Sequence, residues 1–233
     1  MTAGIPVAPV SVAYSLQSRD HARVRAVAEL IRPGAVFVDE AARFTAALDA
    51  LGDVAVIVAS GSRPGARPLA ELTTTAPGPR LVQAFSALAS NGIAKILFTS
   101  GSTGMPKGVL NTHRMLAVNQ QMMRQVWPFL TEQRPVLVDW LPWSHTFGGN
   151  YNVNMVFTAG GTLYVDDGRP APGMFGRTIT NLRDVPPTIY FNVPAGYGQL
   201  VPALEAEPVF AARFFSRLRL MFQCRAGPAG SAP

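Results

Sequence analysis

Cysteine is almost absent from this 233-residue chain, which contains a single one, Cys224. One cysteine excludes an intrachain disulfide framework. Long apolar runs are also missing: stretches such as residues 54–59 fall short of the roughly 18–20 residues of a membrane span, and no basic region followed by an apolar core marks a secretory signal. Charged residues make up only 15% of the chain and apolar residues 48%, the reverse of the composition of disordered proteins. We therefore expect a globular, cytoplasmic protein without a membrane span.

Lysine is scarce as well. Of the 20 basic residues, 18 are arginine and only Lys95 and Lys107 are lysine. The net charge is +6, but the basic residues form no run and aromatic residues are not interleaved with them, as a nucleic-acid-binding surface would require. The sequence therefore does not predict nucleic-acid binding. The excess charge is compatible with a small anionic ligand and equally with a scattered arginine surface.

Short apolar runs alternate with helical patterns along most of the chain. This order is typical of an α/β fold with mainly parallel sheets flanked by helices, and such sheets bind ligands beyond the carboxyl ends of their strands. The expected strands are residues 7–12, 35–38, 54–58, 93–98, 135–141, 162–165, 188–193 and 218–222. The expected helices are residues 20–31, 41–51, 80–88, 112–129, 173–182 and 195–205.

Composition suggests how the chain is divided. Residues 60–78 are rich in Gly, Pro, Ser and Thr, which is typical of a surface linker between two α/β halves. The last eleven residues, 223–233, shift abruptly to Arg, Gly, Ala, Ser and Pro. They are interpreted either as a disordered tail or as the result of truncation, for example by a shifted reading frame, which the excess of arginine over lysine would also fit.

The strongest local signal is Ile-Leu-Phe-Thr-Ser-Gly-Ser-Thr-Gly-Met-Pro-Lys-Gly at residues 96–108. An apolar strand runs into hydroxyl and glycine residues, then a lysine, and a helix is expected from about residue 112. Glycines permit a positive φ and a close approach of the backbone to a ligand, and successive backbone N–H groups form a concave anion site. Hydroxyl groups and the Lys107 ammonium can donate hydrogen bonds to phosphate oxygens. The expected phosphate-binding residues are Thr99, Ser100, Gly101, Ser102, Thr103, Gly104 and Lys107.

This loop differs from two common motifs. The P-loop of nucleoside triphosphatases has Gly directly before the lysine and Ser or Thr after it, whereas here Pro106 precedes Lys107 and Gly108 follows. The Gly-x-Ser-x-Gly nucleophile elbow is absent. A glycine-rich loop without a ligand and a hydrolase that uses Ser102 and His145 remain as alternatives.

Residues 99–108, Thr-Ser-Gly-Ser-Thr-Gly-Met-Pro-Lys-Gly, resemble the phosphate-binding signature of the adenylate-forming enzymes, which include acyl-CoA synthetases, luciferases and peptide-synthetase adenylation domains. Residues 141–150, Leu-Pro-Trp-Ser-His-Thr-Phe-Gly-Gly-Asn, resemble the histidine-bearing segment of that family beside the acyl pocket. Residues 160–170, Gly-Gly-Thr-Leu-Tyr-Val-Asp-Asp-Gly-Arg-Pro, and 13–16, Ala-Tyr-Ser-Leu, look most like feruloyl-CoA synthase and its relatives.

The resemblance implies a two-step reaction. The carboxylate of a small acid attacks the α-phosphate of ATP, which gives an acyl-adenylate and pyrophosphate. The resemblance favours a hydroxycinnamate such as ferulate as the acid, and medium-chain fatty acids and other aryl acids remain as alternatives. The thiol of coenzyme A then displaces AMP to form the thioester. The family uses Mg²⁺ with ATP. Lys107 and His145 are the catalytic residues that the resemblance implies.

The acyl pocket is expected from residues around the histidine. By resemblance, His145 lies where carboxylate, adenylate and thiol meet, while Trp143, Phe147, Gly148 and Tyr151 shape the pocket. Each of these residues could equally be part of an ordinary core. No metal site is expected, because Asp166 and Asp167 before a glycine are typical of a turn and the three histidines lack zinc spacing.

The resemblance covers residues 4–222, which correspond to part of the N-terminal AMP-binding domain of the family. The family's adenine-binding glycine segment, its magnesium-associated glutamate, its ribose-binding Thr-Gly-Asp segment and its mobile C-terminal domain do not appear in the sequence. Two hypotheses therefore stand: the chain is a fragment of an aryl- or acyl-CoA ligase, or it is a catalytically inactive product that binds phosphate weakly. The sequence does not indicate the oligomeric state.

Overall fold

The computed structural model describes residues 1–99 and 104–223 of the chain. The chain divides into two compact units, Met1–Arg114 and Met115–Pro233, and each is described by itself. The division lies in the first turn of a helix and not in the Gly- and Pro-rich segment 60–78. That segment contains a short strand and a helix of the first unit, β3 (Arg67–Pro68) and α4 (Leu69–Thr73), because proline fits both an edge strand and the residue before a helix.

The first unit contains a three-stranded parallel sheet in the order β1-β2-β3. Strand β1 (Val36–Glu40) pairs with β2 (Val56–Ser60), and the helix α3 (Thr45–Leu51) connects them. The buried core packs the strands against that connection and includes Val38, Leu48 and Val58. The remaining helical elements of this unit are α1 (Ala13–Leu16), α2 (Ala22–Ile31), η1 (Ala42–Phe44) and α5 (Pro79–Ser86).

An antiparallel hairpin is the second sheet of this unit. Strand β4 (Ile93–Thr99) pairs with β5 (Lys107–Thr112), and Thr99 lies opposite Lys107 at its open end. We expected the loop to lead directly into a helix, but the chain first reverses into β5, and the helix begins at His113. Strand β5 was missed because its exposed residues carry no clear alternation of apolar and polar side chains.

The expected strand at residues 7–12 is reduced to one bridge beside β4. The Val7 N–H donates to the Ala94 carbonyl at 3.1 Å, and the Ile96 N–H donates to the Val7 carbonyl at 3.0 Å. Prolines flank this bridge at positions 6 and 9, and proline has no N–H to continue a ladder. The apolar run therefore does not extend into a full strand.

The second unit is built on a row of four parallel strands. Strand β6 (Val136–Asp139) pairs with β7 (Thr162–Val165), and β8 (Ile189–Asn192) pairs with β9 (Leu220–Gln223). The Thr188 N–H donates to the Val136 carbonyl at 3.0 Å, which joins the two pairs at one end into the order β7-β6-β8-β9. Gln223, expected in the tail, is the last residue of β9, and residues 224–233 lie outside the described residues.

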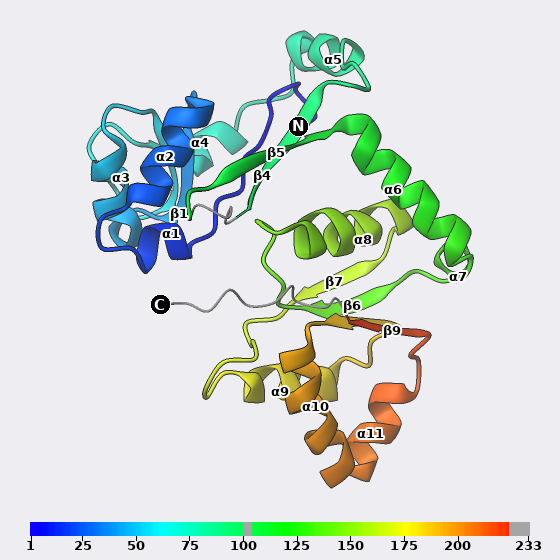
Figure 1. The fold of residues 1–233 in the computed structure, drawn as a ribbon. Helices are drawn as coiled ribbons and strands as arrows, with labels where there is room; N and C mark the ends of the chain where they lie inside the picture. Colours follow the sequence, from blue (N-terminus) through cyan, green and yellow to red (C-terminus); the bar gives the residue numbers. More distant parts are fainter. Residues whose placement is uncertain (100–103, 224–233) are drawn as a thin grey trace. The chain divides into compact units, whose positions relative to one another are not determined.

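Helices cover both faces of this row (Figure 1), as its alternating side chains require. Leu137, Ile189 and Phe191 belong to one buried cluster, which includes residues from the helices that precede and follow β6. Val138 and Tyr190 belong to the other, with residues of the later helices. The elements of the first face are α6 (His113–Val126), α7 (Phe129–Glu132), the π-helix η2 (Phe147–Asn152) and α8 (Val153–Ala159); those of the second are α9 (Phe175–Asp184), α10 (Pro194–Ala206) and α11 (Pro208–Phe215).

The α/β class with mainly parallel sheets is confirmed, since β4 and β5 form the one antiparallel pair among the strands of residues 1–99 and 104–223. No helix in the described part of the chain is both long and apolar enough to cross a membrane.

Candidate functional site

The expected phosphate loop connects the two strands of the hairpin in the first unit. Four of its predicted residues, Ser100, Gly101, Ser102 and Thr103, lie outside the described residues. Thr99 and Lys107 are directly opposite each other across the antiparallel ladder, so their side chains leave the same face of the hairpin. The hairpin therefore brings a hydroxyl and an ammonium to one end of the loop.

Gly104 and Lys107, which follow the four residues that are not described, are both exposed. Gly104 has φ +78° and no atom within 4 Å of the position that a Cβ would occupy, a conformation that glycine adopts without strain. Lys107 is exposed, and it takes part in none of the ion pairs found between described residues. An accessible ammonium without a carboxylate partner is suited to an anionic ligand.

The expected histidine segment begins directly after β6, at the carboxyl end of a parallel strand of the second unit. It ends in the π-helix η2, an uncommon conformation that occurs frequently at functional sites. Two glycines allow this turn to pack against the chain that precedes it. A Cβ at Gly148 would lie 2.7 Å from the Leu141 carbonyl oxygen, and one at Gly149 would overlap the carbonyl oxygen of Trp143.

His145 is exposed and is held by three local hydrogen bonds. Its backbone N–H donates to the Pro142 carbonyl at 3.0 Å, and its carbonyl accepts from the Gly149 N–H at 2.8 Å. Its Nδ1 accepts a hydrogen bond from the Phe147 N–H at 3.3 Å. Because Nδ1 accepts, the neutral ring carries its proton on Nε2 and presents that nitrogen as a donor.

Three of the four expected acyl-pocket residues lie together. The Phe147 and Tyr151 rings are 5.9 Å apart between centroids, and Gly148 lies between them in the same π-helix. Both rings also contact Phe191 on β8 and Phe222 on β9, while Trp127 closes the group against Tyr151. Trp143 is 49% exposed and does not belong to this cluster.

The aromatic cluster is apolar and partly open. Phe147 and Phe191 are buried, whereas Phe222 is 41% exposed. Burial raises the pKa of the Tyr151 hydroxyl, so this hydroxyl is neutral at physiological pH. The cluster combines stacking surfaces with one neutral polar group, a combination common in small-molecule sites.

A buried polar pair beside the histidine segment was missed by the sequence reasoning. Asp139, the last residue of β6, is 4% exposed and Asp166, just after β7, is 6% exposed. The Asp166 N–H donates to the Asp139 carbonyl at 3.0 Å. The signal available in the sequence was a carboxylate at the end of an otherwise apolar strand, where ligand-facing groups of parallel sheets occur.

Asp166 also makes the turn that was expected from Asp-Asp-Gly. Its Oδ1 accepts from the Gly168 N–H at 2.9 Å and from the Asn181 amide at 2.8 Å, while its Oδ2 accepts from the Thr178 hydroxyl at 2.6 Å. The turn prediction is confirmed, and the carboxylate additionally fastens the loop after β7 to α9.

The described residues do not form a site for Mg²⁺. Between residues 1 and 99 and between 104 and 223, no three or more His, Cys, Asp or Glu side chains are grouped so that they could hold a metal ion. The two buried carboxylates, Asp139 and Asp166, already accept hydrogen bonds from the protein at every oxygen. A metal ion thus has no evident ligand set in this part of the chain.

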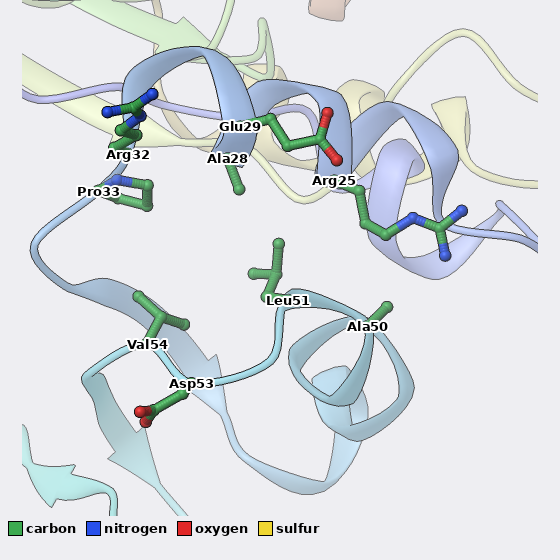
Figure 2. Close-up of a pocket in the computed structure, with 9 residues that line it drawn as sticks. All are labelled: Arg25, Ala28, Glu29, Arg32, Pro33, Ala50, Leu51, Asp53 and Val54. Atoms are coloured by element: carbon green, nitrogen blue, oxygen red, sulfur yellow. The ribbon is translucent and has the colours of Figure 1, made fainter.

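An open pocket of about 380 Å³ lies elsewhere in the first unit, between α2 and the connection from α3 to β2 (Figure 2). Its lining combines the arginines Arg25 and Arg32 with the carboxylates Glu29 and Asp53. Opposite charges side by side favour no single sign of ligand. None of the site residues expected from the sequence lines this pocket.

The whole chain, residues 1–233, matches the model of a protein family described as AMP-binding enzyme. The chain therefore belongs to the AMP-binding enzyme family.

Three proteins illustrate the similarity. A human long-chain-fatty-acid–CoA ligase, ACSBG2, is 27% identical over 124 residues, which are 53% of this chain and 18% of the ligase. The ATP-bound structure of MatB from Rhodopseudomonas palustris has a TM-score of 0.58 at 21% identity, over 92% of this chain and 39% of MatB. The anthranilate CoA ligase AuaEII, in complex with anthranoyl-AMP, also has a TM-score of 0.58, at 18% identity over 86% of this chain and 38% of the other. The two solved structures share the fold, and the chain spans well under half of each of the three proteins.

Proposed function

We propose that this chain is part of an ATP-dependent ligase that joins a carboxylic acid to coenzyme A. The observation that carries the proposal is the hairpin end, where the exposed ammonium of Lys107 lies opposite Thr99 beside the open backbone of Gly104. Family membership supports it, and ATP is bound in the related MatB structure. ATP and coenzyme A are the co-substrates, and the cytoplasm is the location that we propose with them.

Each residue has a proposed role. Lys107, with Thr99, Gly104 and the loop residues 100–103, grips the terminal phosphates of ATP and stabilises the charge that develops on departing pyrophosphate. Preorganised donors of this kind are typically worth roughly 10²–10³ in rate. His145 presents its Nε2–H to the carboxylate end of the acid. No step is assigned to a metal ion.

The acid that we propose is a hydroxycinnamate such as ferulate. In the aromatic cluster, Phe222 is 41% exposed and Tyr151 is half-buried, and a planar aryl group could stack on these two rings. The structure of the anthranilate CoA ligase AuaEII contains anthranoyl-AMP, which supports the choice of an aromatic acid. The name of the human relative specifies long-chain fatty acids, so these are the competing substrate class.

Equilibrium binding of ATP to the 233-residue chain tests the phosphate-binding role. Replacement of Lys107 by alanine removes a charge-assisted hydrogen bond of roughly 1.5–3 kcal/mol, so Kd should rise by about one to two orders of magnitude. Arg80→Ala, on α5, removes an equal charge from an exposed site and should leave Kd unchanged. Equal weakening by both variants would mean that only net charge matters and would refute the assignment.

Thioester formation tests the reaction and separates it from the second candidate, an inactive module that binds phosphate. The chain is incubated with ATP, coenzyme A and either ferulate or a long-chain fatty acid. Acid-dependent release of pyrophosphate with thioester formation would establish the ligase, and the preferred acid would decide the substrate class. ATP binding that depends on Lys107 without any turnover would favour the inactive module.

A further inference from the structure

Asp139 contacts both ends of the segment that carries the histidine. Its Oδ1 accepts a hydrogen bond from the Leu141 N–H at 3.1 Å, and its Oδ2 accepts one from the Asn152 side-chain amide at 2.9 Å. Leu141 begins the segment and Asn152 is the last residue of its π-helix. One carboxyl group therefore closes a loop of twelve residues, 141–152.

The hydrogen bonds that His145 itself makes all lie inside this loop. The bonds from His145 to Pro142, Phe147 and Gly149 all join residues between the two ends. None of them ties the segment to the sheet, whereas Asp139 is itself a residue of β6. The carboxyl group is thus a link between the local order of the segment and the rigid strand row.

The link is buried. Asp139 is 4% exposed and Asn152 is 1% exposed, so water does not compete for these hydrogen bonds. Loss of one partner would leave a buried donor unsatisfied, which costs more than the hydrogen bond itself contributes. An exposed polar pair at the same place could be replaced by water without consequence.

We propose that Asp139 is the positioning residue of the candidate site: its carboxyl group holds both ends of residues 141–152 and so fixes the placement of the His145 ring. The importance of the His145 ring for catalysis rests on the proposed function, but the two hydrogen bonds that link Asp139 to the segment do not. Residues 141–152 also include Phe147 and Tyr151, so the same group positions two walls of the aromatic cluster.

The Asn152 side chain can keep a hydrogen bond to residue 139 whether or not the Asp139 carboxyl is charged. The amide Oδ1 of Asn152 is buried and has no hydrogen-bond partner among the residues that the structure describes. If Asp139 gains a proton, rotation of the amide by half a turn lets this oxygen accept from the new O–H. An asparagine at position 139 could use the same alternative, since its own amide would donate to the rotated Asn152.

The surroundings of Asp139 support such a change of charge. Burial raises its pKa to about 6, and the facing carboxylate of Asp166 contributes in the same direction, while the bonds from Asn152 and Leu141 oppose the shift. Tyr190 on β8 is the other titratable group that interacts with both carboxylates, and burial raises its pKa as well. Neither an aspartate nor a tyrosine side chain can carry a positive charge, so neither Asp166 nor Tyr190 stabilises the ionised form of Asp139 as a cation would.

Hydrogen exchange of the Phe147 amide in the full chain, followed by NMR, tests the proposal. This amide donates to the His145 ring and reports the order of the segment. We expect Asp139→Ala to accelerate its exchange at least about tenfold, Asn152→Ala to accelerate it less, and Asp139→Asn to leave it within about twofold of the wild type. In the wild type the Leu141 amide shift should titrate with a midpoint near pH 6, and this titration should vanish in Asp139→Asn.

Asp166→Ala is the matched control. This carboxylate is equally buried and fastens α9 instead of the histidine segment, so its loss should accelerate exchange in α9 and not at Phe147. Acceleration of Phe147 to the same extent in Asp166→Ala, or its absence in both Asp139→Ala and Asn152→Ala, would overturn the proposal. If Asp139→Ala fails to fold, Asn152→Ala and Asp139→Asn still decide it. None of these measurements needs turnover, so a negative thioester assay would refute the ligase function alone.

Discussion

At the scale of single residues, the most unusual group is the carboxyl of Asp139, because burial keeps its pKa far above the ordinary value of 3.8. A carboxyl with a raised pKa holds its proton more tightly in the folded than in the unfolded chain. Its contribution to stability is therefore present at low pH and is lost as pH rises through about 6.

Replacement of Asp139 by asparagine should flatten the pH dependence of stability. Ionisation of the buried carboxyl costs the folded chain about 3 kcal/mol above pH 6, by the difference between the two pKa values. Asp139→Asn removes this cost. The free energy of unfolding of the variant, relative to that of the wild type, should therefore be larger at pH 8 than at pH 5. Urea unfolding at the two pH values measures the gain. An equal difference between variant and wild type at both pH values would contradict the raised pKa.

At the scale of elements, the π-helix η2 depends on glycine more than on any large side chain. Gly148 and Gly149 pack directly on the backbone of residues 141–143. A methyl group at either position would have to push backbone atoms apart, and backbone yields less easily than a flexible side chain. The conformation is therefore encoded by the absence of two side chains.

Gly149→Ala should destabilise the second unit by about 1–3 kcal/mol or more, the usual cost of overpacking. Gly176→Ala is the control, since this exposed glycine of α9 has no atom within 4 Å of the added methyl, and alanine in a helix should stabilise by about 0.5–1 kcal/mol. Chemical denaturation of the two variants gives both values. Equal effects of the same sign would show that the close approach to Trp143 is not a constraint.

The sequence predicts elements well where composition and burial agree. The strands of the second unit are apolar except for one terminal residue each. They were all predicted within two residues at either end, as were the main helices α2, α9 and α10. The helix α11 was missed although Pro208 marks its first turn, because its apolar residues surround the helix and leave no one-sided pattern. The hairpin strand β5 was missed because its partner, and not its own sequence, defines it.

Less of the candidate site could be predicted. The loop and the histidine segment were found from their residue types, and the structure gives the surroundings of Thr99, Gly104, Lys107 and His145. Asp139 could not be found in this way, since its role depends on a contact with Asn152 thirteen residues later. The exposure of Trp143, against the burial of Phe147, likewise depends on the direction in which the π-helix turns.

At the scale of the whole molecule, the chain consists of two units with separate cores. The core of the first unit includes Leu48, and one of the two clusters of the second includes Leu182. Both side chains are at most 2% exposed. Buried leucines contribute to stability through local packing. A cavity in one core should therefore lower the stability of its own unit more than that of the other unit.

Leu48→Ala and Leu182→Ala should therefore act on different parts of an unfolding curve. Each deletion should cost about 2–5 kcal/mol. We expect Leu48→Ala to lower the unfolding transition of the first unit and Leu182→Ala that of the second, which calorimetry combined with the fluorescence of the tryptophans, all located in the second unit, can separate. A single transition that shifts equally in both variants would mean that the units unfold as one.

The π-helix has a further consequence, which concerns chain length. A π turn accommodates about one residue more than an α turn. The π-helix η2 therefore contains one extra residue directly before α8. Deletion of one residue from 147–152 would let α8 continue as a regular helix and would rotate everything before the deletion by roughly 100° about its axis. His145 would then leave its present direction although no side chain of the aromatic cluster had been substituted. In an alignment of relatives, a one-residue gap at this place would therefore mark a change in the geometry of the site.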